Sequence, residues 1–195
     1  MNADAIQVVS AALAQRLKDA IATADHPKIE GEVFVGPLDD QNAKDKALVV
    51  FLYRVGVNAD LRNSRHTLPP AADGGPLTVY DGSLPLDLHY LITAGSEQAN
   101  NELDTLRTLG FALQTLNDSP ILVGQGEVVR LSLESVSCEE LSRIWTLFPT
   151  ANYRTSVVFV ATPVWVDPAR INVSGAPVVR EPHKVGQIDV GAARG

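Results

Sequence analysis

The chain has 195 residues, 45% of them hydrophobic, which is typical of one globular domain with a sizeable core. Its net charge of −7 and isoelectric point near 5.0 argue against nucleic acid or anionic lipid as partners, because the protein's field repels both. A single cysteine, Cys138, excludes an intramolecular disulfide. The N-terminus does not resemble a signal peptide, and no apolar run is long enough to span a membrane. We therefore expect synthesis and assembly in the cytoplasm.

The first quarter of the chain predicts a helix followed by two strands. Apolar residues recur at spacings of three and four, which predicts a helix with one buried stripe; they are Ile6, Val9, Leu13, Leu17 and Ile21. We expect Asn2 or Asp4 to cap its start. Residues 32–35 predict a short strand. Six consecutive apolar residues, 48–53, predict a central strand over 47–55 that is buried on both faces.

A long loop, a strand and a second helix are expected next. Residues 56–84 are rich in proline and glycine and too long for an ordinary connection, so this loop is functional or partly disordered, with a small edge strand at 77–80. Period-two alternation over 84–93 predicts a strand, although 86–93 could also open a helix. Residues 97–117 predict a long helix. Its expected buried stripe is Leu103, Leu106, Leu109 or Gly110, Leu113 and Leu116.

The last third of the chain predicts extended pieces at 121–123 and 127–136, a helix and a long final strand over 153–166. The helix begins at a capping box, in which the side chains of Ser137 and Glu140 satisfy opposite backbone donors. Its expected buried residues are Leu141, Ile144, Trp145 and Phe148. No helical or strand period continues after Asp167, which is typical of an extended tail that orders on a neighbouring subunit.

Together these elements predict an α/β (α+β) fold in a single domain. We expect a mixed sheet of about five strands, flanked by about three helices on one or both faces, over residues 1–167. Residues 168–195 are expected to form an extended C-terminal tail or arm. The sequence leaves open which strands are parallel, antiparallel or at an edge.

The residues form no recognisable catalytic, cofactor or metal motif. The four histidines, at positions 26, 66, 89 and 183, are scattered, which favours surface or structural roles over metal ligation. Asp87 and His89 share a strand face and could act as a general-base pair, but no nucleophile follows in a strand–turn–helix setting. A polar pair facing solvent or a subunit contact is therefore favoured. We predict no catalytic residue, no metal and no cofactor.

Six residues are candidates for contacts with a partner: Asn58, Arg62, Asn63, Arg65, Tyr153 and Arg154. The first four lie in the loop after the central strand, and loops carry binding groups on rigid scaffolds. The arginines bring planar donors that suit carboxylates on a partner. A loop that satisfies its own polar groups is the open alternative.

Four motifs occur in a fixed order along the chain: FLYRVGVNADLRN at 51–63, LPLDLHYLITAG at 84–95, LGFALQTLNDSPIL at 109–122 and LSRIWTLFPTANYRTSVVFVATPVWVD at 141–167. In these motifs the chain resembles the cap, or tail-terminator, family of extracellular contractile injection systems. Such systems are phage-tail-like particles of the antifeeding-prophage and Photorhabdus virulence cassette type. The resemblance extends from about Ile6 to Asp167, and the tail after Asp167 matches nothing in the family pattern.

The resemblance implies a structural protein and not an enzyme. Such a protein is expected to form a homo-hexameric ring at the end of the particle distal to the baseplate. There it would contact the inner tube protein and the sheath protein, stop their polymerisation and anchor the sheath end, in a particle that can be released from the cell. Neither nucleic acid nor membrane is an expected partner. The competing functions are a small hydrolase that uses Asp87 and His89, and a monomeric ligand-binding module.

Overall fold

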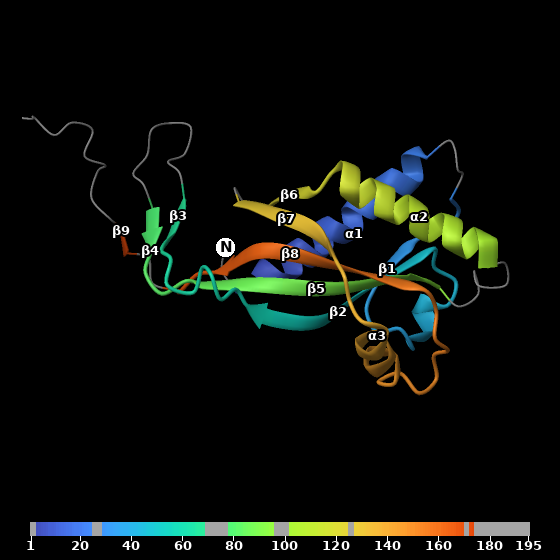
Figure 1. The fold of residues 1–195 in the computed structure, drawn as a ribbon. Coiled ribbons are helices and arrows are strands. Elements are labelled where there is room, and N and C mark those ends of the chain that lie inside the picture. Colours follow the sequence, from blue (N-terminus) through green and yellow to red (C-terminus); the bar gives the residue numbers. More distant parts are fainter. Residues whose placement is uncertain are drawn as a thin grey trace, which may run out of the picture.

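A computed structural model describes residues 3–24, 29–68, 78–95, 102–124, 127–169 and 172–173. Several predicted features lie outside these ranges: Asn2, His26, His183, the start of the helix predicted at 97–117 and most of the C-terminal tail. Figure 1 shows a long central sheet with helices on both of its faces and a small second sheet beyond one of its ends.

The central sheet has six strands in the order β1-β2-β5-β8-β7-β6. Its long middle strands are β2 (Leu48–Val57), β5 (Leu84–Ala94) and β8 (Ser156–Val166). The outer strands are β1 (Val33–Val35), β7 (Glu127–Glu134) and β6 (Ile121–Gly124). Strand β1 pairs with β2 in parallel, and every other pair in this sheet is antiparallel. The expected mixed α+β class is therefore confirmed.

The second sheet consists of β3 (His66–Leu68), β4 (Thr78–Tyr80) and β9 (Asn172–Val173). The sequence predicts only the middle one of these strands. Strands of two or three residues cannot display a period of two, so local patterning does not reveal them. The described residues therefore form more strands than the predicted five.

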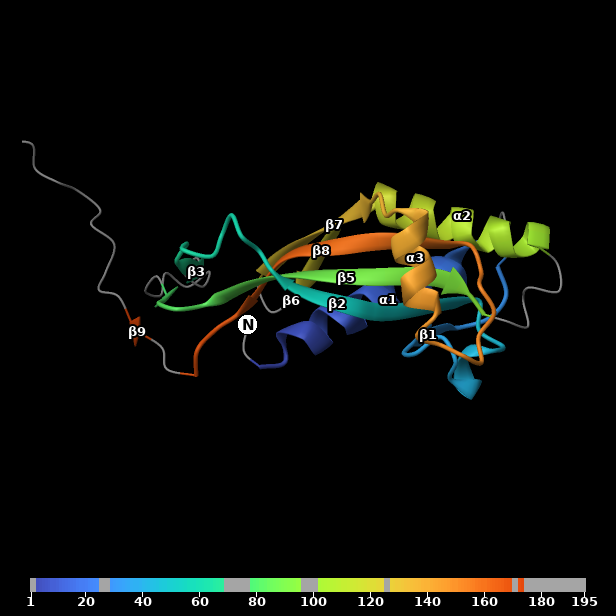
Figure 2. The same ribbon diagram turned by 60° about the horizontal axis from the view of Figure 1, so that its bottom comes forward.

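Two helices cover one face of the central sheet, and a third covers part of the other (Figures 1 and 2). Helices α1 (Ala5–Thr23) and α2 (Glu102–Asp118) pack in one apolar core with the sheet, and Leu13, Leu17, Tyr90 and Leu116 are fully buried there. None of the helices in the described ranges has the length and apolar character needed to cross a lipid bilayer.

Helix α3 (Cys138–Trp145) covers the opposite face at one end only. Its side of the sheet holds a second apolar cluster, in which Ile144, Trp145 and Phe148 pack against Val49 and Leu91. The predicted start of this helix is confirmed, because the Ser137 hydroxyl accepts the Glu140 backbone N–H at 3.1 Å. At α1, Asp4 occupies the capping position but its side chain makes no capping hydrogen bond.

The prediction for the buried face of α2 is partly wrong. Leu109 and Leu116 are buried as expected, but Leu103 and Leu106 are 73% and 43% exposed. Threonines take their place in the core, and the Thr108 hydroxyl is satisfied by the Asp104 carbonyl at 2.9 Å. This helix carries apolar residues on two faces, and a period of 3.6 residues does not decide which face meets the sheet.

Candidate interaction surfaces

The loop that follows β2 exposes three of the six predicted contact residues. Arg62, Asn63 and Arg65 all lie on the surface. The Arg65 Nε is 3.3 Å from the Asp81 carboxylate, but both side chains are more than half exposed, so this ion pair contributes little stability. Within the described residues Arg62 has no ionic partner, and its guanidinium is available to another molecule.

The start of this loop is fixed by Asn58, another predicted contact residue. Its side-chain amide donates to the Asp87 carboxylate at 2.9 Å and to the Thr162 hydroxyl at 3.2 Å. The Thr162 hydroxyl in turn donates to Asp87. The Asn58 side-chain oxygen accepts the backbone N–H of Leu61 at 3.0 Å, which closes the turn. Asn58 thus uses its hydrogen bonds inside the molecule to position the loop.

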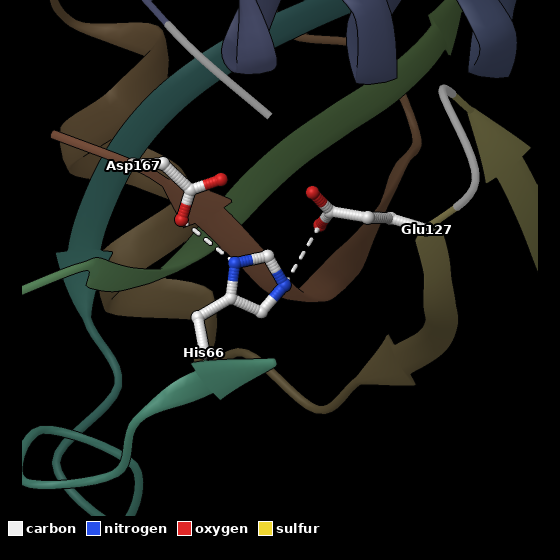
Figure 3. A group of neighbouring side chains, drawn as sticks. All are labelled: His66, Glu127 and Asp167. Atoms are coloured by element: carbon white, nitrogen blue, oxygen red, sulfur yellow. Dashed lines mark hydrogen bonds and ion pairs between the residues drawn. The ribbon is translucent and has the colours of Figure 1, made fainter. Parts of the chain in front are cut away.

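The end of the loop is fixed by His66, at the start of β3. Figure 3 shows its ring between two carboxylates that come from the end of β8 and the start of β7. The His66 Nδ1 lies 2.7 Å from Asp167, and an ionised carboxylate can only accept, so this nitrogen carries a proton. The ring also stacks on Trp165 at 4.7 Å and on Tyr80 at 5.8 Å between centroids. Because Trp165 belongs to β8 and Asp167 follows that strand, the contacts of His66 with these two residues attach the small sheet to the central one.

Asp167 is held in its ionised form by its neighbours. Burial alone would raise the pKa of this carboxyl, but the hydrogen bonds that it accepts, among them those from Ser83 at 2.6 Å and from His66, lower the pKa below its usual value. The group therefore accepts two buried hydrogen bonds as a carboxylate at neutral pH.

The His66, Glu127 and Asp167 side chains could also be considered as metal ligands, since candidate ligand atoms lie within 4.8 Å of one another. However, the Nδ1 proton points to Asp167, so one ion could bind only Nε2 and Glu127, which are 3.7 Å apart. Zinc sites take three or four protein ligands. The arrangement fits a histidine that is hydrogen-bonded to a carboxylate better than a metal centre, and the absence of a metal stays a prediction.

The opposite end of the sheet holds the other two predicted contact residues. Arg154 donates to the Ala94 carbonyl, and its guanidinium lies 5.3 Å from the centroid of the Trp145 ring. Burial lowers the pKa of this arginine. The Tyr153 and Trp145 rings pack in an edge-to-face arrangement with 5.6 Å between centroids, but Tyr153 remains 62% exposed. Arg154 therefore supports this end from inside, and Tyr153 presents an aromatic surface to solvent.

Tyr153 borders a cavity of about 430 Å³ between segments 38–44 and 150–154. Its lining includes Asp39 and Asp40, and the first segment contains the short 3₁₀ helix η1 (Gln41–Ala43). Asp40 caps that helix by accepting the Asn42 backbone N–H at 2.8 Å. Asp39 is exposed on the surface. No local sequence pattern marks this cavity, because its two walls are more than a hundred residues apart in the chain.

Asp87 and His89 do not act on each other as a pair. The His89 Nδ1 lies 2.8 Å from the Glu134 carboxylate, whereas Asp87 accepts hydrogen bonds from Asn58 and Thr162. Next to them, burial first and the Glu134 charge second raise the pKa of Tyr53 to about 12, so this phenol stays neutral. Asp87 and His89, the two residues of the hydrolase alternative, are therefore each hydrogen-bonded to other side chains.

The sequence matches the Pvc16 N-terminal domain over residues 8–180, so the match continues past Asp167, where the resemblance was expected to end. The chain belongs to the Pvc16 N-terminal domain family. This confirms the expected terminator family of contractile injection systems. No curated protein matches the sequence significantly.

Two solved structures share the fold of this Pvc16 N-terminal domain. One is the PVC sheath/tube terminator of an extracellular contractile injection system in the extended state, with 18% identity and a TM-score of 0.58 over 96% of this chain. The other is the tube terminating cap of the anti-feeding prophage, with 19% identity and a TM-score of 0.58 over 91% of this chain. The alignments cover 65% and 60% of those two chains, so this chain spans less than two thirds of their length. At such identities the likeness is one of fold.

Proposed function

We propose that this protein caps a contractile injection particle as a ring of six copies that ends the inner tube and the sheath. One observation carries the proposal: the fold of nearly the whole chain matches two structures that are described as a sheath/tube terminator and a tube terminating cap. In this role the ring sits on the last layer of tube and sheath subunits, stops their polymerisation and anchors the sheath end. Such a particle can be released from the cell that assembles it.

In this proposal the protein works through its shape and its association with other subunits, and it catalyses no reaction. The hydrolase alternative requires Asp87 and His89 to work together, and each is instead bonded to a different side chain. The alternative of a monomeric binding module differs from the cap in one measurable respect, since it requires no ring.

Within this proposal, residues 1–167 are the cap domain and residues 168–195 are an arm that reaches a neighbouring subunit. Arg62, Asn63, Arg65 and Tyr153 are the contact residues, since their side chains are exposed. Asn58 and Arg154 support these contact residues indirectly. Asn58 fixes the loop, and Arg154 fixes the aromatic cluster around Trp145.

The proposal is tested by deleting the gene in cells that make the particle and measuring particle lengths by electron microscopy. We expect overlong or ragged tubes and sheaths that detach, and recovery when the wild-type gene is restored. Particles of normal length and intact ends in the deletion strain would refute the function.

Native mass spectrometry of the purified full chain gives a second measurement, with six copies as the expected ring. If the chain is monomeric alone, the same measurement is made after tube ends of its own particle are added, because a ring can require the tube as a template. A monomer under both conditions would support a binding module instead.

A further inference from the structure

Exposed side chains of opposite charge lie at the two ends of the central sheet. Segment 29–46, which precedes β2, contains five carboxylates and two lysines. Lys46 is already bonded to Glu32 at 3.0 Å and lies 3.5 Å from Asp45. The loop after β2 carries the exposed Arg62 and Arg65 together with the exposed Asp60, and Arg65 lies 3.3 Å from Asp81, which leaves Arg62 as the arginine without an ionic partner among the described residues. The ten residues of β2 separate the two segments by about 33 Å, so they cannot meet within one molecule.

The arginine loop is preorganised, although it lies on the surface. Buried or half-buried polar groups fix it at both ends, through Asn58 with Asp87 at one end and His66 with Asp167 at the other. Between them the Ser64 backbone N–H donates to the Leu61 carbonyl at 2.9 Å. A loop backbone that is held in this way loses little conformational entropy when it binds. The backbone at Arg62 is therefore already positioned for a partner.

The cavity beside Tyr153 has the chemistry to receive an arginine. Asp39 lies in its wall as an exposed carboxylate, which matches the planar donors of a guanidinium. The Tyr153 side chain is 62% exposed, and an exposed aromatic ring can contact a guanidinium. Two cations also line the cavity: Lys44, which is exposed, and Arg154, whose guanidinium donates to the Ala94 carbonyl and lies over the Trp145 ring. Asp40 accepts a capping hydrogen bond, so Asp39 is the carboxylate that is offered to a second molecule.

We propose that the arginine loop (residues 58–65) of one copy docks into the cavity between segments 38–44 and 150–154 of the next copy, with Arg62 against Asp39 and Tyr153. The inference rests on the proposed ring and adds the surfaces that build it. Complementary groups at opposite ends of a molecule make a head-to-tail contact, and such contacts close into a ring when the rotation between copies permits. The partner is therefore a second copy of this chain.

The test exchanges the two charges in the full-length protein. Arg62→Glu alone and Asp39→Arg alone each place like charges in every contact of the ring. We expect each to lower ring formation about tenfold or more, because like charges across an interface are strongly unfavourable. Ring formation is measured by native mass spectrometry and by electron microscopy of particle ends. Circular dichroism confirms that each variant is folded.

An equal mixture of the two variants is the decisive sample. When the copies alternate, the glutamate introduced by Arg62→Glu faces the arginine introduced by Asp39→Arg, and the next contact joins a native Arg62 to a native Asp39. Every contact then pairs opposite charges, and an alternating ring closes because six is an even number. We expect recovery to near the wild-type level, with equal numbers of both variants in each ring when one of them carries a mass tag. Arg107→Glu, an exposed charge reversal on α2, serves as the control and should assemble normally.

The outcomes separate this inference from the function on which it rests. If both single variants form rings as well as the wild type does, or if folded variants do not recover on mixing, the docking of the arginine loop is wrong while the ring stands. If the wild type forms no ring alone or on tube ends, the proposed function itself fails.

Discussion

The two ends of the central sheet are held together by different forces. At the loop end, buried polar side chains bond one another across the sheet, as His66 does with Asp167. At the α3 end, aromatic rings fill the space, and Phe51 and Phe148 pack edge to face with 5.1 Å between centroids. Hydrogen bonds are directional and fix one loop conformation, whereas apolar packing tolerates several similar shapes. Hydrogen bonds are therefore better suited than apolar packing to an exposed loop that must keep one conformation.

The largest effect is expected from Trp145→Ala at the aromatic end. Its ring is 5% exposed and supports Ile144, Tyr153 and Arg154, so its removal should lower the free energy of unfolding by about 3–5 kcal/mol. Urea denaturation measures the change. Ser156→Ala is the matched control, because it keeps the ring and removes two hydrogen bonds of the Ser156 hydroxyl, one accepted from the Trp145 Nε1–H and one donated to the Arg154 carbonyl, and it should cost about 1–2 kcal/mol. A loss for Trp145→Ala no larger than that of the control would show that this cluster does not hold the end.

At the polar end, His66→Ala should lower the free energy of unfolding by about 2–3 kcal/mol, because it leaves the buried Asp167 with one fewer donor and empties the space beside Trp165. His66→Phe keeps a ring in the stack but no donor. If His66→Phe is as stable as the wild type, stacking and not hydrogen bonding holds this end, and the two ends no longer differ in kind.

The pH dependence of the polar end follows from Asp167. Its pKa is lower in the folded protein than in the unfolded chain, so the unfolded chain binds more protons as the solution becomes acidic. The stabilisation is therefore complete above about pH 4, near the unfolded pKa, and is lost as the pH falls through the lower folded value. Asp167→Asn should cost about 1–2 kcal/mol at pH 7 and progressively less below about pH 4. Urea midpoints at several pH values test this, and a constant difference would contradict it.

Asn58→Ala should lower the free energy of unfolding by about 1–2 kcal/mol, since Asp87 and Thr162 lose a half-buried donor. Hydrogen exchange at the Leu61 amide should speed up, because this N–H bonds to the Asn58 side chain. Asn63→Ala in the same loop is the exposed control and should change neither quantity. Equal effects of the two substitutions would remove the distinction between positioning and contact residues.

The smallest effect on stability is expected from Arg62→Ala. An exposed side chain without an ionic partner among the described residues should change the free energy of unfolding by less than about 0.5 kcal/mol. Ring formation should nevertheless fall, and the two are measured on the same sample by urea denaturation and native mass spectrometry. A stability loss near that of Asn58→Ala would mean that Arg62 supports the loop from within.

Much of the fold was predictable because the relevant signals are local. Apolar runs located β2 and β8, and alternation located β5. A serine and a glutamate three residues apart located the start of α3. The exposed arginine loop was also predictable, since two arginines and two asparagines after a buried strand indicate a surface segment. The buried face of α2 was not, because two faces of that helix carry leucines and only packing against the sheet selects one of them.

By itself, the sequence determined the family, the α+β class, the positions of the main elements and the surface character of the arginine loop, because each is encoded in short stretches of residues. Only the tertiary structure decided what fixes that loop and where its proposed docking cavity lies. His66 and Asp167 are 101 residues apart, and the two walls of the cavity belong to different ends of the chain. Such pairs leave no periodic pattern, since sheet pairing and not chain order brings their side chains together.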